Sequence, residues 1–481
     1  MIAFMTRTRR RELLATMTAA TVPGIAGCTD LLEEDTDEET PADDEPSDDG
    51  ESSDTGDGND EAGEDDAEEE HPETIEEAAT LFVEDVTDER FADASERFRS
   101  TVRARVGAPG RIELVWLGLT AVGGEFEAIV GTEATVVSGF DAVDVRMAFE
   151  RGTHALRVVV TSDLEVQDIG IADDYERPSY VDLDAIDEES VTVETGSCQL
   201  NGLVTTPANA DGDVPGVVLV HGSGPSDMDV DNGGTRLFQD LAEGLASNGV
   251  AALRYEKRNP ACPPDLADYT LDTVTVDPAL AALEELRTVE GVDPDRIAVV
   301  GHSLGGMAVP RLAARDGDLV GGVALAAPAR SFHDLTVDQV EHQATVIDHE
   351  WPQLTAQYED WVDRVDRIRA GDYNPSDLIL EYPGAFWDSL DAYDHLGTAQ
   401  EIDAPLYFLQ GERDYQVTLE DDFEQWQEAL VERSDIAFDR YDGLNHLLMS
   451  GEGPSVPTEY PARNNVDERV VADVAGWIRE R

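Results

Sequence analysis

The sequence predicts an α/β domain over residues 187–481, built on a mostly parallel, doubly wound sheet and preceded by a smaller α+β domain. Two observations predict this fold. Short apolar runs alternate with longer stretches of helical spacing, and polar residues with catalytic chemistry directly follow several of these runs. The runs are 216–220, 250–255, 297–301 and 320–326, and the helical stretches are 237–248, 278–289 and 304–315. Strands that are apolar throughout are buried on both faces, so helices are expected to cover both faces of this sheet.

The first 28 residues are expected to be an export signal rather than part of a fold. Residues 8–14 contain paired arginines followed by two leucines, and this pattern resembles a twin-arginine signal. The mildly apolar stretch that follows is too short to remain in a bilayer as a spanning helix. It ends in Ile-Ala-Gly before Cys28, which resembles a lipobox. We therefore expect cleavage before Cys28, lipid modification of its thiol and anchoring to the outer face of the cell membrane.

Residues 29–72 are expected to form a disordered acidic tether. Between residues 31 and 70 there are 22 acidic residues and no lysine or arginine. Such a segment cannot bury enough apolar surface to offset the entropy of ordering, and its charges repel one another. Its simplest role is to hold the folded part away from the membrane.

The whole chain is strongly acidic, with 105 Asp and Glu residues against 33 Lys and Arg residues and a formal charge of −72. Lys257 is the single lysine, and every other basic residue is arginine. This composition predicts a protein that works in molar salt, where a Debye length of about 3 Å screens the mutual repulsion of carboxylates. Nucleic acid is excluded as a partner because its phosphate backbone requires a basic surface.

Residues 73–180 are expected to form the smaller α+β domain. Apolar residues recur at helical spacing over 75–86, and Phe91, Phe98 and Val102 are expected to continue a second helix. Beyond Pro109 the pattern favours strands, at 112–116, 126–130, 135–137, 143–149 and 156–160. Helices followed by consecutive strands are typical of an α+β arrangement. Its expected role is scaffolding, dimerisation or shaping the entrance to the neighbouring site.

Cys198 and Cys262 lie in the folded part and show no metal-ligand spacing. They are compatible with one disulfide outside the cell or with two buried thiols, and the sequence leaves both open. We expect neither a metal nor a cofactor.

The strongest catalytic motif is Gly-His-Ser-Leu-Gly-Gly at 301–306, which lies between a predicted strand and a predicted helix. In that context, G-x-S-x-G indicates a nucleophile elbow, whose tight turn exposes the hydroxyl of Ser303. The following helix starts at Leu304, whose backbone N–H is expected to stabilise an oxyanion. A second oxyanion-hole donor is expected from the glycine-containing loop after the strand 217–220. We predict Ser223 as this donor, with Gly224 as the less favoured alternative.

Two further strand ends carry an acid and a base. Asp414 follows the apolar run 405–409, and His446 follows a predicted strand end near Tyr441. An acid at such a position orients the imidazole, which then acts as general base and general acid. Glu412 is the competing carboxylate. The order Ser303, Asp414, His446 along the chain matches the order that this arrangement requires.

At this point the chain resembles carboxylesterases of the α/β-hydrolase superfamily, in a branch with a small α+β domain ahead of the catalytic one. The resemblance rests on residues 221–229, 252–258, 301–310, 410–417 and 443–446. It implies the α/β-hydrolase fold, a small-molecule ester substrate and a preference for short acyl chains. Related branches include thioesterases, acyltransferases and serine aminopeptidases, so the leaving group stays open.

Residues 332–403 lie between two predicted strands, and in this fold such an insertion is commonly a helical cap over the site. The alternative is a helical decoration packed elsewhere. Two other functions also stay open. One is a serine exopeptidase with the same triad, and the other is a surface binding lipoprotein with an inert hydrolase fold. The sequence does not define the oligomeric state.

Overall fold

The computed structural model describes residues 72–196 and 198–481. The predicted signal with Cys28 and nearly all of the predicted tether lie outside these residues. In the described part, none of the helices is long and apolar enough to cross a membrane.

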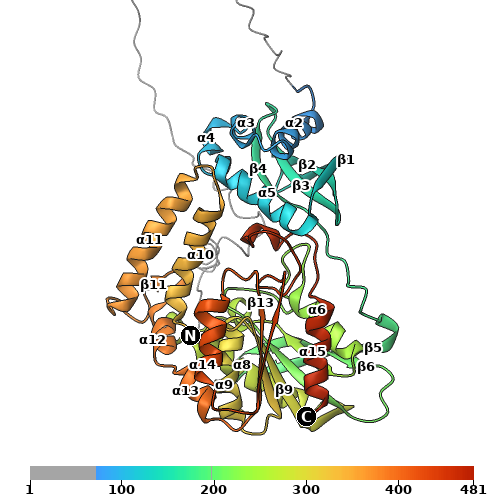
Figure 1. Cartoon of the computed structure of the whole chain (residues 1–481), viewed down its shortest axis with the longest axis vertical. Helices are drawn as coiled ribbons and strands as arrows, with labels where there is room; N and C mark the ends of the chain where they lie inside the picture. Colours follow the sequence, from blue (N-terminus) through green and yellow to red (C-terminus); the bar gives the residue numbers. More distant parts are fainter. Residues whose placement is uncertain (1–71, 197) are drawn as a thin grey trace, which may run out of the picture.

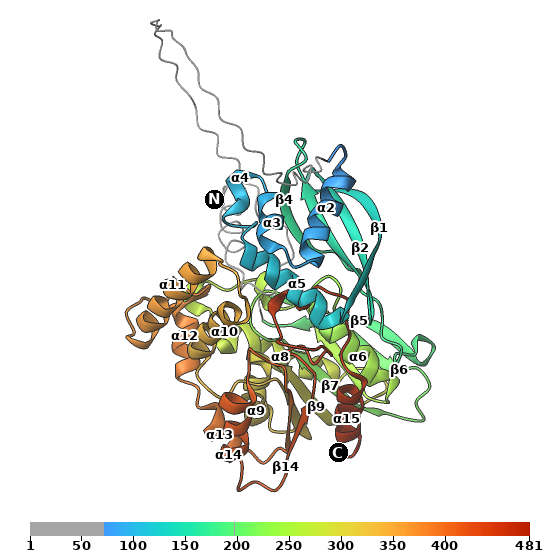
Figure 2. The same ribbon diagram turned by 45° about the horizontal axis from the view of Figure 1, so that its top comes forward.

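An antiparallel four-stranded sheet and four helices form the front part of the molecule. The helices are α2 (Ile75–Thr87), α3 (Phe91–Glu96), α4 (Ser100–Arg103) and α5 (Pro109–Gly123). The strands pair in the order β1 (Phe126–Val137), β2 (Phe140–Phe149), β3 (Gly152–Val160) and β4 (Val166–Ile171). Buried side chains such as Phe82 of α2 and Leu119 of α5 share one core with Val145 and Leu156 of the sheet. Figures 1 and 2 show this part stacked on one end of the larger sheet.

The predicted strand 112–116 is wrong, because these residues lie inside α5. Helix α5 is apolar on nearly all sides, and a helix of this kind shows no amphipathic period that would separate it from buried strands. Pro109 at its first turn is compatible with a helix start. The segment predicted as the second helix forms two short helices instead, α3 and α4. The strands predicted at 126–130 and 135–137 form one continuous strand, β1.

The large sheet confirms the predicted α/β fold class. Its strands are β5 (Ile186–Glu194), β6 (Gln199–Pro207), β7 (Val214–Val220), β8 (Ala251–Tyr255), β9 (Val292–His302), β10 (Gly321–Leu325), β13 (Leu406–Gly411) and β14 (Ile436–Tyr441). They lie in the order β14-β13-β10-β9-β7-β8-β6-β5. The six strands from β14 to β8 run parallel, whereas β6 pairs antiparallel with β8 and β5. The sequence did not predict β5, β6 or the front strand β4.

Helices cover both faces of the large sheet, as predicted. Val218 and Val220 of β7 belong to the core shared with α8 (Asp277–Leu286) and α9 (Leu304–Asp316). The alternate residues Val217 and Leu219 face α6 (Leu237–Ser247) and α15 (Glu468–Arg479). Figure 1 shows α6 and α15 on one side of the strands and α9 on the other. One strand therefore contributes to two cores, which explains its apolar sequence. The short helices α7 (Arg258–Ala261) and α14 (Glu424–Ala429) complete this domain.

The chain between β10 and β13 is mostly helical. It contains α10 (Phe332–Val346), α11 (Pro352–Arg369), the strand pair β11 (Leu378–Ile379) and β12 (Tyr382–Pro383), α12 (Gly384–Asp391) and α13 (His395–Glu401). Helix α5 holds the turn between α10 and α11: the carboxylate of Glu113 accepts hydrogen bonds from the backbone N–H groups of Asp348 and His349, each at 2.9 Å. The front part therefore contacts this insertion directly.

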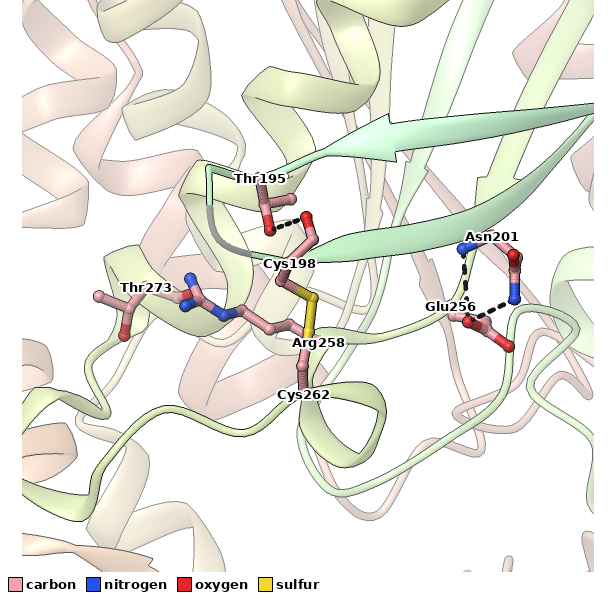
Figure 3. Close-up of a disulfide and its surroundings, with 7 residues drawn as sticks. All are labelled: Thr195, Cys198, Asn201, Glu256, Arg258, Cys262 and Thr273. Atoms are coloured by element: carbon pink, nitrogen blue, oxygen red, sulfur yellow. Dashed lines mark hydrogen bonds between the residues drawn. A yellow bond between two sulfur atoms is a disulfide. The ribbon is translucent and has the colours of Figure 1, made fainter. Parts of the chain in front are cut away.

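A disulfide joins Cys198, immediately before β6, to Cys262, which ends α7. Figure 3 shows this bridge at the turn between β5 and β6. The two Cα atoms are 6.4 Å apart, within the range of disulfides. The structure thus favours the bonded state over the two free thiols that the sequence had left open.

We predict that the double variant Cys198→Ser/Cys262→Ser loses stability, because the bridge closes a loop between residues 64 positions apart. The chain-entropy relation gives a loss of about 4 kcal/mol in the free energy of unfolding. Denaturant unfolding in molar salt measures this loss. Thiol titration of the unfolded wild-type protein, with and without reductant, shows whether Cys198 and Cys262 are bonded. A double variant within about 1 kcal/mol of wild type would contradict a stabilising bridge.

Candidate active site

Ser303 lies at the turn between β9 and α9, as predicted for a nucleophile elbow. Its backbone has φ 55° and ψ −121°, a conformation that is strained for a residue with a side chain. The Ser303 N–H donates to the carbonyl of Leu325 in β10 at 2.9 Å, which ties the turn to the neighbouring strand. The serine side chain is mostly buried, at 7% exposure of the residue.

The turn leaves no space for side chains on the surrounding glycines. A Cβ atom on Gly301 would lie 2.2 Å from the carbonyl oxygen of Gly305, and one on Gly305 would lie 2.2 Å from that of Val220. A Cβ atom on Gly222 would lie 3.1 Å from the Cβ of Ser303. The loop after β7 therefore passes directly beside Ser303, where the oxyanion-hole prediction requires it.

Asp414 and His446 are in direct contact. His446 Nδ1 lies 2.8 Å from Asp414 Oδ2, and both residues are buried. Asp414 Oδ1 accepts from the N–H groups of Gln416 and Val417, and Oδ2 also accepts from Gln410 Nε2 at 2.8 Å. These donors hold the carboxylate in one orientation.

The competing carboxylate, Glu412, does not occupy this position. Its Oε1 lies 3.1 Å from Arg440 Nε on the neighbouring strand β14. The structure therefore brings Asp414, rather than Glu412, to the imidazole of His446.

His302 connects His446 to the elbow. Its Nε2 lies 2.9 Å from the carbonyl oxygen of His446, and the centres of the two rings are 4.7 Å apart. Burial lowers the pKa of His302 to about 3, with a further contribution from His446, so its ring is neutral. A neutral ring facing a carbonyl carries its proton on Nε2 and donates it. The residue before Ser303 thus fixes the backbone of His446 at the same end of the sheet.

Two residues that were not predicted as site residues hold the loop after β7. Lys257 Nζ donates to the carbonyl oxygens of Gly222, at 2.5 Å, and of Gly224. From the opposite side, Gly224 N–H donates to the phenol oxygen of Tyr382 in β12 at 2.7 Å. Because Tyr382 engages the Gly224 N–H, Ser223 remains the better candidate for the second oxyanion donor. The first, Leu304, opens α9 beside Ser303.

Burial changes the acid–base properties of these two residues in opposite directions. It lowers the pKa of Lys257 to about 7 and raises the pKa of Tyr382 to about 12. Both shifts disfavour the charged form, as expected for groups removed from water. Two sequence signals marked Lys257: it is the only lysine of the chain, and it lies in the run 252–258 that carries the family resemblance. Tyr382 lies in a two-residue strand that no pattern marks.

A cavity of about 700 Å³ is lined in part by Asp414 and lies between α10 and the loops that follow β13 and β14. Its wall includes Arg330, His342, Arg413 and Tyr415. Over residues 72–196 and 198–481, no group of three or more His, Cys, Asp or Glu side chains is arranged to hold a metal ion.

Comparison with known proteins extends this description. The sequence pattern described as "Alpha/beta hydrolase family" matches residues 217–457. The chain is similar to Esterase EstD of Thermotoga maritima, with 32% identity over 409 residues that cover 84% of this chain and 95% of that protein. This alignment is longer than the predicted domain 187–481, so the likeness extends into the front part.

Similar solved structures have lower identity. Est1E from Butyrivibrio proteoclasticus is 15% identical with a TM-score of 0.41, over 61% of this chain and 99% of that one. An esterase of Pyrobaculum calidifontis is 18% identical with a TM-score of 0.40, over 61% and 85%.

We predict that Gly305→Ala disrupts the elbow, because the new Cβ would collide with the backbone of β7. The expected loss is about 1–3 kcal/mol in the free energy of unfolding. The matched control is Gly476→Ala in α15, where a Cβ meets nothing within 4 Å. That change should leave stability unaltered or raise it by up to about 1 kcal/mol. Equal unfolding midpoints for the two variants would contradict the close approach of α9 and β7.

Proposed function

Because this chain belongs to the alpha/beta hydrolase family and is an esterase of that family, we propose that it cleaves carboxylic esters with a triad of Ser303, His446 and Asp414. The observation that carries the proposal is the buried contact between His446 Nδ1 and Asp414 Oδ2 at 2.8 Å, beside a strained serine turn. A buried, fully hydrogen-bonded carboxylate on Nδ1 leaves Nε2 as the nitrogen that can accept a proton. The bond from His302 to the His446 carbonyl supports the approach of that ring to Ser303.

In the proposed reaction, His446 Nε2 takes the proton of Ser303 Oγ as this oxygen attacks the ester carbonyl carbon. The imidazolium, stabilised by Asp414, then gives the proton to the departing alkoxide, which leaves as the alcohol. A water molecule attacks the acyl-enzyme with His446 again as base, and the carboxylic acid is released with Ser303 restored. The oxyanion formed in each half-reaction accepts hydrogen bonds from the N–H groups of Leu304 and Ser223.

A preference for short acyl chains is supported by the side chains packed around Tyr382. Its ring stacks on Phe386 with centroids 4.4 Å apart, and Tyr269, Phe332 and Trp387 surround this pair. These buried rings occupy the space next to the 222–224 loop, so the room for an acyl chain on that side is limited.

We further propose that the enzyme is a lipoprotein on the outer face of the membrane of a salt-adapted cell. The order of paired arginines, apolar stretch and lipobox ending at Cys28 supports export and anchoring. The Cys198–Cys262 bridge supports an oxidising compartment, where disulfides persist. The charge of −72 supports work at high salt.

We predict that Ser303→Ala abolishes turnover of p-nitrophenyl acetate in molar salt and prevents labelling by a fluorophosphonate probe. Ser190→Ala on the exposed part of β5 is the control and should match wild type in both assays. Turnover by Ser303→Ala near the wild-type rate would reject the nucleophile. Wild-type protein that neither turns over esters nor takes the label would favour an inert binding lipoprotein, and faster cleavage of aminoacyl arylamides than of esters would favour an exopeptidase.

We predict that Cys28→Ser abolishes lipid modification and shifts the protein from the membrane fraction, because acyl chains contribute about 0.8 kcal/mol per buried CH₂ to anchoring. Metabolic labelling with a lipid precursor and fractionation of an expressing cell measure both effects. Cys198→Ser serves as the control for loss of a cysteine outside the signal. Equal membrane retention and labelling of wild type and Cys28→Ser would argue against a lipid anchor at this position.

A further inference from the structure

We propose that Lys257 is a positioning residue for the oxyanion hole, acting through the backbone of the 222–224 loop. This inference rests on the proposed function, because it assigns a role in the same reaction. Lys257 follows β8, lies outside the Ser303, Asp414 and His446 constellation, and is 4% exposed. Its ammonium group touches loop carbonyls rather than the nucleophile.

The argument begins with the geometry of one peptide unit. The carbonyl of Gly222 and the N–H of Ser223 belong to the same planar trans peptide, so they point in opposite directions. Lys257 Nζ holds the Gly222 oxygen at 2.5 Å. A donor that fixes this oxygen on one side of the loop therefore directs the Ser223 N–H to the other side. A Cβ atom on Gly222 would lie 3.1 Å from the Cβ of Ser303, so this peptide unit lies next to the nucleophile of the proposed triad.

The next two peptide units are fixed as well. Lys257 Nζ also donates to the carbonyl of Gly224, while the Gly224 N–H donates to Tyr382. The loop is thus held by Lys257 from the large domain and by Tyr382 from the insertion. With both neighbours of Ser223 restrained, its N–H is held in place before an oxyanion forms, which is the condition for effective electrostatic stabilisation.

The residue type at 257 supports a specific requirement for an ammonium group. All other basic residues of this chain are arginine, so the composition otherwise avoids lysine. An ammonium is compact and directs three donors from one atom, whereas the planar guanidinium is larger and its donors form a fixed fork. Here two carbonyl oxygens accept hydrogen bonds from a single buried nitrogen atom, and an ammonium group fits this arrangement better than a guanidinium group.

Burial makes this arrangement costly as a purely structural device. It lowers the pKa of Lys257 to about 7, so the environment disfavours the charge. A buried apolar side chain of similar length, such as methionine, would avoid that cost. Methionine, however, has no hydrogen-bond donors, whereas Lys257 donates to the two loop carbonyls.

The segment that carries Lys257 is itself anchored. Lys257 precedes α7, and Cys262 at the end of α7 is bonded to Cys198. In Figure 3, Arg258 extends from the same segment toward Thr273, whose carbonyl it contacts at 2.9 Å. The backbone segment that carries the Lys257 side chain is therefore held by the disulfide and by the hydrogen bond of Arg258.

The test compares Lys257→Met with Arg254→Met in molar salt. Arg254 is a buried cation in β8, the strand that precedes Lys257, but it pairs with Asp229 and Glu188 instead of the 222–224 carbonyls. We expect Lys257→Met to lower kcat for p-nitrophenyl acetate by roughly 100-fold, as for the loss of one oxyanion donor, with little change in KM. Affinity for a boronic acid, which forms a tetrahedral adduct on serine, should fall by a similar factor. Arg254→Met should lower thermal stability while kcat stays within about threefold of wild type.

A folded Lys257→Met variant with kcat and boronic acid affinity within about threefold of wild type would overturn the inference. Equal losses of kcat in both variants would do so too, since they would indicate a general effect of removing a buried cation. If Ser303→Ala is inactive while Lys257→Met is fully active, the proposed function stands and this inference alone fails. If wild type shows neither turnover nor labelling, the proposed function has failed first.

A second measurement needs no variant. Because the chain has one lysine, ¹⁵N-lysine labelling gives a single side-chain nitrogen signal. We expect the Nζ protons to exchange slowly with water. We also expect the Nζ chemical shift to change when the boronic acid adduct forms. The adduct would accept a hydrogen bond from the Ser223 N–H, and this N–H shares a peptide unit with the carbonyl that Lys257 contacts. An Nζ signal that exchanges rapidly or ignores the adduct would overturn the inference even where Lys257→Met does not fold.

Discussion

The close approach of three backbone segments around Ser303 is the constraint on which the rest of this structure depends. The carbonyl oxygens of Gly305 and Val220 lie where side chains on Gly301 and Gly305 would have to be. Strand β9, helix α9 and the end of β7 therefore form one unit without side chains between them. This contact explains why Ser303 can hold a strained φ of 55°, and why the loop after β7 has a defined position beside it.

Asp414 and His446 are positioned in a different way, mainly by side-chain hydrogen bonds. Asp414 accepts from Gln410, from the N–H groups of residues 416 and 417, and from the His446 ring. In a buried setting each of these donors strengthens the others, and an unpaired carboxylate would be costly. His302 then links the His446 carbonyl to the elbow. The two kinds of restraint meet at the carboxyl ends of β9, β13 and β14, where a doubly wound sheet accommodates a site.

Much of this arrangement could be predicted because its signals are local in the sequence. The central strands are apolar on both faces, and Ser303, Asp414 and His446 each follow such a strand or its loop. The edge strand β5 escaped prediction because it is half exposed, and its residues 187–190 are all polar. The neighbouring strand β6 escaped because it mixes polar and apolar residues. Helix α5 was misread as a strand because it is buried on nearly all sides. Tyr382 depends wholly on tertiary contact, since its hydroxyl reaches a loop 158 residues away.

The same misread helix gives the front part its connection to the site. Glu113 of α5 holds the backbone of residues 348 and 349 at one end of the insertion, and Tyr382 near its other end holds Gly224. Both contacts act on one insertion, so α5 is connected to the 222–224 loop through the packed helices of that insertion. The front part therefore contacts the insertion that holds the 222–224 loop, although the residues of the proposed triad all come from the large domain.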